Sequence, residues 1–246
     1  MDTLAWPGRK GRARRWRRER IETDGEFDRL VEALESLDRK PNATPEEADN
    51  ESVDRTAEIA RSFGATVVRE SVHNIARVRN AGALVARGDV LAFVDADTTV
   101  PPHFLERIAE VMVDAACMGG RADIVHTPTS KLLRAYLEAW RWLGIRLRMA
   151  QGAAQFCRKS AFTLLSGYDE SQFMGEDVDF YWRLQRLCAR IGGYLKFLDD
   201  LKVVPSPRRF DQTPIWRMLI WTNPLFIALF RKTSSAWKEW YVRTPR

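Results

Sequence analysis

A short apolar run that ends in two carboxylates is the most constraining feature of this sequence. Residues 90–94 (Val-Leu-Ala-Phe-Val) are followed by Asp95 and Asp97, which stand one residue apart. Four to eight apolar residues bounded by turn-forming residues indicate a buried strand, typically in a parallel sheet covered on both faces. Ligands of such sheets gather at the carboxyl ends of the strands. The run therefore predicts an α/β fold with Asp95 and Asp97 at its functional edge.

The two acids at the end of this strand allow two interpretations. Carboxylates in such a place are costly to bury unless a cation pairs with them. A divalent metal, Mg²⁺ or Mn²⁺, suits them, with substrate phosphates completing its oxygen ligands. A solvated turn is the alternative, because Asp is common in turns. The acids by themselves leave both interpretations open.

Helices and strands are expected to alternate along the chain. Apolar residues at helical spacing predict helices over residues 27–39, 52–63, 75–86, 101–116, 131–149, 159–165 and 173–192. Short apolar or β-branched runs predict strands over residues 65–69, 89–94 and 152–158. This alternation is typical of βαβ units and predicts a mostly parallel sheet flanked by helices.

Positive charge is concentrated at the N-terminus. Residues 1–20 carry eight Lys or Arg and two acids, which accounts for the whole net charge of +6. We expect residues 1–24 to form a basic, disordered tail, with contact to anionic lipid or nucleic acid as the alternative. No nucleic-acid-binding motif supports the latter partner. Three widely spaced cysteines and the lack of an apolar leader after the basic residues predict a reduced, cytoplasmic protein.

The C-terminal segment, residues 211–246, is expected to be helical and unusually apolar. Its most apolar window is Ile215–Phe230, sixteen residues that include Arg217, Asn223 and Pro224. That window is too short and too interrupted for a transmembrane helix. A helical hairpin or an in-plane membrane anchor, flanked by Trp and basic residues, fits it better. Burial against the rest of the domain remains the alternative.

Several short motifs, in one order, resemble those of family-two glycosyltransferases. Residues 49–59 (DNESVDRTAEI) are similar to the family's DNGSTDGT segment, and residues 75–82 (IARVRNAG) to its ARN-G helix. Residues 95–97 (DAD) resemble the metal-binding DXD motif. GYD at 167–169 and GED at 175–177 resemble the GG-[FY]-D stretch and the catalytic ED motif. The resemblance implies a GT-A fold over residues 25–210, with a Rossmann-like nucleotide half joined to an acceptor half.

The resemblance implies a role for each acid. Asp97 would hold the divalent metal, and Asp95 would contact the donor ribose or the metal indirectly. Asp177 matches the general base that takes the proton of the acceptor hydroxyl. Glu176 would bind or orient the acceptor. Asp179 is the fallback base, although two residues along a helix it points away from Asp177.

The resemblance also implies a donor site and an activity. Asp49 and Arg79 match positions that read the nucleotide base. Arg208 and Arg209 lie where a loop closes over the diphosphate, with a plain surface loop as the alternative. The implied activity is metal-dependent, inverting transfer of a sugar from a nucleotide-diphospho-sugar to an acceptor hydroxyl. The apolar helices hint at a lipid-linked acceptor and a place at the cytoplasmic face of a membrane.

The chain departs from the family pattern at its N-terminus. Residues 1–24 are Arg-rich where family members open with an apolar strand, and residues 45–49 (PEEAD) are hardly apolar where the second strand is expected. A frameshift or a misassigned start would explain such an opening. If the strands are lost, the chain would be a degraded relative that acts as a binding or interaction module, which is the alternative function.

Overall fold

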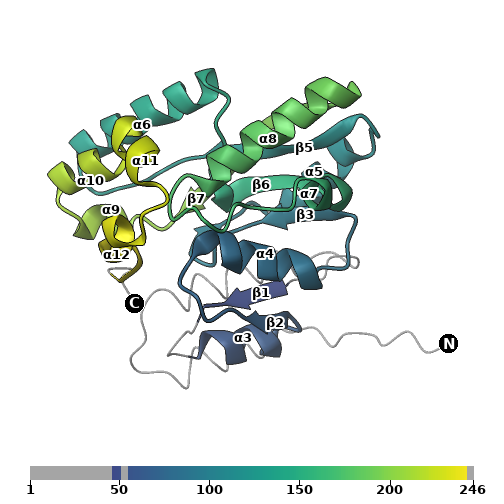
Figure 1. Ribbon diagram of the computed structural model, residues 1–246, viewed down its shortest axis with the longest axis horizontal. Coiled ribbons are helices and arrows are strands. Elements are labelled where there is room, and N and C mark those ends of the chain that lie inside the picture. The colour runs from purple at the N-terminus through teal and green to yellow at the C-terminus, as the bar shows by residue number, and fades with distance from the viewer. Residues whose placement is uncertain (1–45, 51–54, 243–246) are drawn as a thin grey trace.

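The computed structural model describes residues 46–50 and 55–242. The basic tail predicted for residues 1–24 and the helix predicted for residues 27–39 lie outside this part of the chain. Strands form the centre of the molecule and helices surround them (Figure 1). This is the α/β architecture with flanking helices that the alternation of periodic segments predicts.

The elements follow one another with short connections. The strands are β1 (Glu46–Asp49), β2 (Thr66–Arg69), β3 (Val90–Phe93), β4 (Thr98–Thr99), β5 (Cys117–Ile124), β6 (Gln155–Arg158) and β7 (Tyr194–Pro205). The helices are α3 (Thr56–Ser62), α4 (Ile75–Val85), α5 (Phe104–Met112), α6 (Lys131–Arg146), α7 (Lys159–Leu164), α8 (Glu176–Ile191), α9 (Arg208–Gln212), α10 (Ile215–Trp221), α11 (Pro224–Phe230) and α12 (Ser234–Val242). A single 3₁₀ turn, η1 (Gly152–Ala154), leads into β6.

The strand directions correct the expectation of a mostly parallel sheet. The main sheet has the order β3-β6-β5-β7-β4, and β1 pairs with β2 in a second, parallel sheet. Within the main sheet β5 and β7 are parallel, whereas β6 runs antiparallel to both β3 and β5, and β4 runs antiparallel to β7. Side-chain periodicity reports which faces of a strand are buried and is blind to the direction of its neighbour, so the mixed pattern was not predictable from it.

The second strand of the family pattern is present, against the expectation that it is degraded. β1 pairs with β2 in parallel register, from Glu46 opposite Thr66 to Asp49 opposite Arg69. The ladder uses backbone groups, so a strand without apolar side chains can form it. Helix α4 packs on this pair, and a Cβ atom at Gly82 would lie 3.7 Å from that of Ala48.

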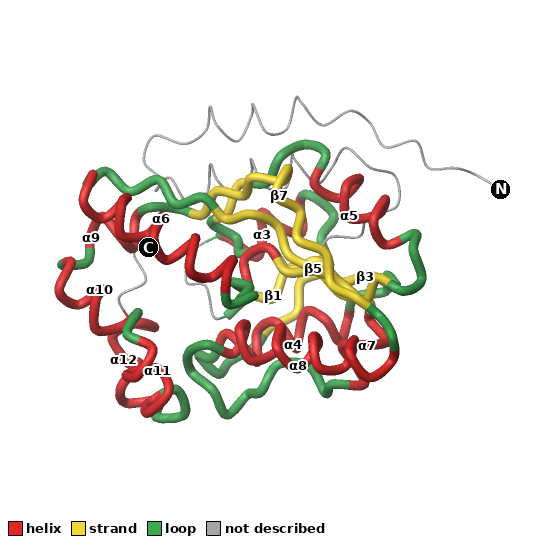
Figure 2. Tube along the Cα trace, turned by 90° about the horizontal axis from the view of Figure 1, so that it is seen from above, coloured by secondary structure: helices red, strands yellow, loops and turns green. Residues whose placement is uncertain are grey.

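Two apolar clusters cover the two faces of the main sheet. Helix α5 contributes Phe104 and Ile108 to the cluster that contains Phe156. The next residue of β6, Cys157, belongs to the other cluster, which contains side chains of α4, α7 and α8. Because successive residues of a strand point to opposite faces, these clusters are separate layers. Figure 2 shows α5 on one side of the strands and α4, α7 and α8 on the other.

Strands β5 and β7 have no counterpart in the sequence-based assignment. Strand β5 reads Cys-Met-Gly-Gly-Arg-Ala-Asp-Ile, which has neither an apolar run nor an alternation that favours a strand. Its glycines have a packing role, because a Cβ atom at Gly120 would collide with the carbonyl oxygen of Lys196 in β7. Close approach of the two backbones therefore replaces side-chain patterning at this position.

The apolar window at residues 215–230 forms two short helices. Asn223 separates them, and its side-chain oxygen accepts bonds from the backbone amides of Leu225 (2.9 Å) and Phe226 (3.1 Å) at the start of α11. Helices α9 to α12 gather with α6 at one end of the molecule (Figures 1 and 2). Within residues 46–50 and 55–242, no helix is long and apolar enough to cross a membrane.

Candidate active site

The turn that follows β3 carries Asp95 and Asp97, as predicted. The backbone carbonyl of Asp95 accepts a bond from the amide of Thr98 (2.9 Å), which closes the turn. The carbonyl of Asp97 accepts a bond from the amide of Ser206 (3.0 Å), just beyond the end of β7. The pairing of β4 with β7 thus brings the late part of the chain to this turn.

The two arginines that the sequence assigned to a late loop open helix α9 instead, directly after the strand end that meets this turn. The amide and side chain of Arg208 donate to the hydroxyl of Ser206 at 3.3 and 3.4 Å. The guanidinium of Arg209 lies 4.0 Å from the ring centre of Trp240, and burial there lowers its pKa. Asp97 and Asp95 act in the opposite direction on that pKa, so Arg209 is within electrostatic range of both carboxylates.

Helix α8 begins with the predicted pair Glu176 and Asp177. Both acids lie in the first turn, where the positive end of the helix dipole favours negative charge. Glu176 is buried, with 4% of its surface exposed, whereas Asp177 is half-buried. The helix dipole alone would explain acids at these positions, so the residues around them must show whether they form a functional site.

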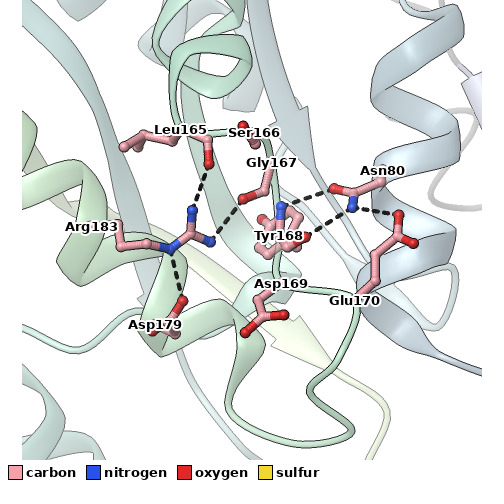
Figure 3. Close-up of a pocket in the computed structure, with 9 residues that line it drawn as sticks. All are labelled: Asn80, Leu165, Ser166, Gly167, Tyr168, Asp169, Glu170, Asp179 and Arg183. Carbon is pink, nitrogen blue, oxygen red and sulfur yellow. Dashed lines mark hydrogen bonds and ion pairs between the residues drawn. The ribbon is translucent and has the colours of Figure 1, made fainter.

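The loop that precedes α8 is fastened to helix α4 by Asn80 (Figure 3). The Asn80 amide nitrogen donates to the carbonyl of Tyr168 (3.0 Å) and to the carboxylate of Glu170 (2.9 Å), and its oxygen accepts from the amide of Tyr168 (2.9 Å). Asn74 adds bonds to the carbonyls of Glu170 (3.1 Å) and Gln172 (3.0 Å). Helix α4, which carries the ARN-like motif, therefore holds the loop that leads into the acid pair.

Asp179, the alternative base, has a structural partner. Its carboxylate accepts a bond from Arg183 at 2.8 Å, and the same guanidinium donates to the carbonyls of Leu165 and Gly167, each at 2.8 Å. Figure 3 shows this group on the opposite side of the loop from Asn80. The arrangement favours a role in holding the loop for Asp179.

Arg79 joins the two acid motifs. Its guanidinium donates to the carboxylate of Glu176 at 2.7 Å and to that of Asp95 at 3.0 Å. The side chain is 10% exposed and lies 5.6 Å from the ring centre of Tyr168. Asp95 is 16 positions and Glu176 is 97 positions from Arg79 in the sequence, and both meet at this one buried cation. The resemblance had implied that Arg79 reads the nucleotide base, and that role stays a prediction.

Burial and charge act against each other in this cluster. Burial lowers the pKa of Arg79, but Asp95 and Glu176 outweigh it and hold that pKa above its ordinary value. Burial raises the pKa of Glu176, with Asp177 adding to the rise and Arg79 opposing it. Burial also raises the pKa of Asp177, again opposed by Arg79. The cluster therefore holds carboxylates with enhanced proton affinity beside a permanent cation.

Backbone donors orient Asp177. One carboxylate oxygen accepts from the amide of Gly152 (2.8 Å), and the other from the amide of Val178 (2.7 Å). The side chain of Gln155 donates to the Asp177 carbonyl at 3.0 Å. A Cβ atom at Gly152 would collide with the guanidinium of Arg79, so a larger residue at this position would displace that side chain.

Gly152, Gln155 and Tyr168 are site residues that sequence reasoning missed. They carry no charge, and they reach the site through the turn into β6 and the loop before α8. Gly152 and Gln155 match no motif, whereas Tyr168 lies in the GYD stretch at residues 167–169, which gave it no role of its own. A glycine beside a short strand was a further signal, since it marks a close approach. Asp49, by contrast, lies buried at the end of β1 in the two-stranded sheet, and its predicted contact with the nucleotide base stays a prediction.

The chemistry of the turn at residues 95–97 suits a divalent metal. Asp95 and Asp97 provide two carboxylates at a strand end, and the side chain of Asp95 is 46% exposed. Mg²⁺ and related ions are commonly held by one or two protein carboxylates together with substrate phosphates and water. Two carboxylates with Arg209 of α9 within electrostatic range fit that mode of binding.

Comparison with solved structures supports the GT-A fold. The chain is similar to the mannosyltransferase PcManGT from Pyrobaculum calidifontis in complex with GDP-Man and Mn²⁺, with a TM-score of 0.55 and 18% identity over 74% of this chain and 54% of that one. It is also similar to TarS from S. aureus in complex with UDP, with a TM-score of 0.57 and 13% identity over 90% of this chain and 74% of that one. Likeness at this level of identity concerns the fold.

Sequence comparison supplies the family. A "Pre-mycofactocin glycosyltransferase" of Mycobacterium tuberculosis is 31% identical over 128 residues, which cover 47% of this chain and 27% of the relative. The chain thus matches about a quarter of the length of that curated relative. The family model described as "Glycosyl transferase family 2" matches residues 24–165, more than half of the chain. The chain therefore belongs to glycosyl transferase family 2.

Proposed function

We propose that this protein is a metal-dependent, inverting glycosyltransferase that moves a sugar from a nucleoside diphosphate sugar to an acceptor hydroxyl. The observation that carries the proposal is the meeting of Asp95 and Glu176 at the buried guanidinium of Arg79. One terminal nitrogen of this guanidinium binds the donor-side acid Asp95, and the other binds Glu176 of the acceptor-side pair. Such a division suits a reaction between two substrates.

The donor side consists of the turn at residues 95–97 and helix α9, which begins with Arg208. Asp97, with Asp95, would hold Mg²⁺ or Mn²⁺, which would neutralise negative charge on the leaving diphosphate. The guanidiniums of Arg208 and Arg209 would bind diphosphate oxygens, for which their planar donor geometry is suited. The solved relatives in complex with GDP-Man and with UDP support a nucleotide donor for this chain.

The acceptor side is centred on Asp177. Its carboxylate would remove the proton of the acceptor hydroxyl while that oxygen forms a bond to the anomeric carbon. The bond from that carbon to the diphosphate breaks on the opposite face, and its electron pair leaves with the diphosphate, so the configuration inverts. A raised pKa suits this task, because a general base works best when its pKa is close to the working pH. Glu176, fixed by Arg79, would orient the acceptor.

The proposed location is the cytoplasmic face of a membrane, where the acceptor would be a lipid-linked or otherwise hydrophobic hydroxyl compound. Support comes from helices α10 and α11, which have many exposed apolar side chains. Exposed apolar area of this kind marks an interaction surface.

Two measurements test the donor and acceptor sides separately. Calorimetry with UDP or GDP, each with and without Mn²⁺, should show metal-dependent binding to the wild-type chain that Asp97→Ala abolishes. Asp177→Asn should bind the nucleotide as the wild type does but release no nucleoside diphosphate from a panel of UDP- and GDP-sugars with membrane extract as acceptor. Asp179→Asn is the matched control, because it alters an acid on the same helix turn that is paired with Arg183.

The outcomes separate enzyme from binding module. Transfer by Asp177→Asn at the wild-type rate would refute the assignment of the base. Loss of transfer in Asp179→Asn alone would move that role to Asp179. A wild-type chain that binds neither nucleotide and releases none would favour the inactive binding or interaction module.

A further inference from the structure

Helices α10 and α11 expose an apolar surface at one end of the molecule. On each helix exposed side chains recur four residues apart, so they form one stripe along the helix. Seven large apolar residues of these helices are at least 38% exposed, and they form what we call the outer apolar face: Ile215, Trp216, Leu219, Ile220, Leu225, Leu229 and Phe230. Leu225 and Leu229 are the most exposed of them, at 74% and 75%.

The inner sides of the same helices are apolar as well. Met218 and Trp221 of α10 pack with Trp237 of α12 in a small core, with Phe226 and Ile227 of α11 against it. A helix that is apolar on all sides is usually buried in a protein core or in a membrane. Here the inner side has its core, while the outer side has no protein covering among the described residues.

The charges of α10 are arranged against contact with water. Arg217 is its one charged residue, and instead of facing outward it pairs with Glu239 of α12 at 2.6 Å, with 18% of its side chain exposed. Helix α11 contains no charged residue. A water-facing surface helix places its charged residues on the outer side. The reversal indicates that the outer apolar face meets an apolar phase.

The charge around this face indicates which partner provides that phase. Residues 215–242, which leave out the donor-site residues Arg208 and Arg209, contain four basic residues and one acid. The acid, Glu239, is paired with Arg217, and Lys232 lies 3.5 Å from Asp169 while 58% of its side chain stays exposed. The excess positive charge would repel a second copy of the same face. It would attract anionic lipid headgroups.

We propose that α10 and α11 lie flat in the headgroup region of an anionic bilayer, with the outer apolar face inserted. Each helix has seven residues, which suits lying in the interface and not spanning it. Trp216 supplies an aromatic ring of the kind that prefers this depth. The inference deepens the proposed function, on which it rests for its meaning, by naming the chemistry of the membrane partner.

Hydrogen bonds connect the helices that carry the outer apolar face to the loop before the acid pair Glu176 and Asp177. The amide of Phe173 donates to the carbonyl of Arg231, at the end of α11, at 2.6 Å. The hydroxyl of Tyr241 in α12 donates to the carbonyl of Phe173 at 3.1 Å. Phe173 lies three residues before Glu176, so insertion of the helices would bring the loop before the acid pair to the bilayer. A lipid-linked acceptor would then reach Asp177 without leaving the membrane.

Vesicle sedimentation tests the inference on the full chain, without any sugar substrate. Vesicles of phosphatidylcholine with phosphatidylglycerol should bind the wild type, and Leu225→Glu with Leu229→Glu should weaken that binding by at least about tenfold, because two apolar side chains no longer insert. The matched control is Leu84→Glu with Val113→Glu. These two apolar side chains are 82% and 84% exposed and lie outside the outer apolar face. This control should bind as the wild type does.

Salt separates the apolar contribution from purely electrostatic binding by the Arg-rich N-terminal residues. High salt screens exposed charges, so the binding that remains there should belong to the outer apolar face and disappear in the Leu225/Leu229 variant. Equal binding of that variant and the wild type, or no vesicle binding by the wild type, would overturn the inference. So would a dimer in the absence of vesicles that the same two substitutions dissociate.

Failure of the inference is distinguishable from failure of the proposed function. Asp177→Asn should bind vesicles as the wild type does, although it transfers no sugar. Vesicle binding by an inactive wild type would overturn the enzymatic proposal alone. Nucleotide-sugar turnover by a wild type that ignores vesicles would overturn the membrane inference alone.

Discussion

Replacing Arg79 by Met should destabilise the folded protein strongly, because the substitution leaves buried carboxylates without their cation. Glu176 is 4% exposed, and Arg79 is its ion-pair partner at 2.7 Å. Removing one partner of a buried ion pair costs about 3–5 kcal/mol, since the remaining charge stays desolvated. Loss of the pair with Asp95 destabilises the protein less, because 46% of the Asp95 side chain is exposed and water screens its charge.

The loss should depend on pH with a definite sign. Arg79 lowers the pKa of both Glu176 and Asp177, so its removal should raise both values further. Between the unfolded pKa of about 4 and the raised folded values, the folded variant binds more protons than the unfolded chain, so its stability falls as pH rises. The free energy of unfolding, measured by urea denaturation, should therefore drop more at pH 8 than at pH 5.

Two further variants make the test specific. Arg79→Met combined with Glu176→Gln should recover part of the lost stability, because the uncompensated buried charge is removed with its partner. Arg107→Met is the control, since Arg107 pairs with Asp200 at 2.6 Å on the solvated surface and should contribute far less. A loss below about 1 kcal/mol for Arg79→Met at pH 8, or a loss that is independent of pH, would refute the reasoning.

Two other predictions follow from the same geometry and from β1. Gly152→Ala should displace the Arg79 guanidinium, because the added Cβ collides with it. The free energy of unfolding should fall by about 1–3 kcal/mol. If the effects of Gly152→Ala and Arg79→Met were additive in a double-mutant cycle, the collision would not be the cause. Burial, with Asp49 adding to it, raises the pKa of Glu47 from 4.5 to about 7, so stability falls as pH rises through this window. Glu47→Gln should remove up to about 3 kcal/mol of that dependence, and an unchanged melting-temperature slope between these pH values would count against the raised pKa of Glu47.

Local pattern was enough to find the helices that bear the site. The spacing of apolar residues predicted α4, α6, α7 and α8 to within a few residues of their observed bounds. The strand at residues 89–94 and the acids after it were also found, because a run of apolar residues and the turn that ends it are contiguous in sequence. These features depend on near neighbours, which a sequence displays directly.

Pattern was insufficient where backbone geometry replaces side-chain periodicity. Strand β5 with its paired glycines, strand β7 with its central acids, and the reversed direction of β6 are set by close approach and by ladder partners. Strand β1 was expected to be degraded, yet it forms a full parallel ladder through its backbone. Neither kind of interaction leaves a regular side-chain signal.

The sequence by itself determined that Asp95, Asp97, Glu176 and Asp177 would stand at the ends of regular elements, in the order that the family pattern implies. Tertiary structure alone decided that Arg79 would bridge the two acid motifs, because a guanidinium reaches only a few ångströms and its partners are 16 and 97 residues away. The apolar run before Asp95 fixes where the carboxylates are presented. Folding of the loop before α8 against α4 decides what those carboxylates face.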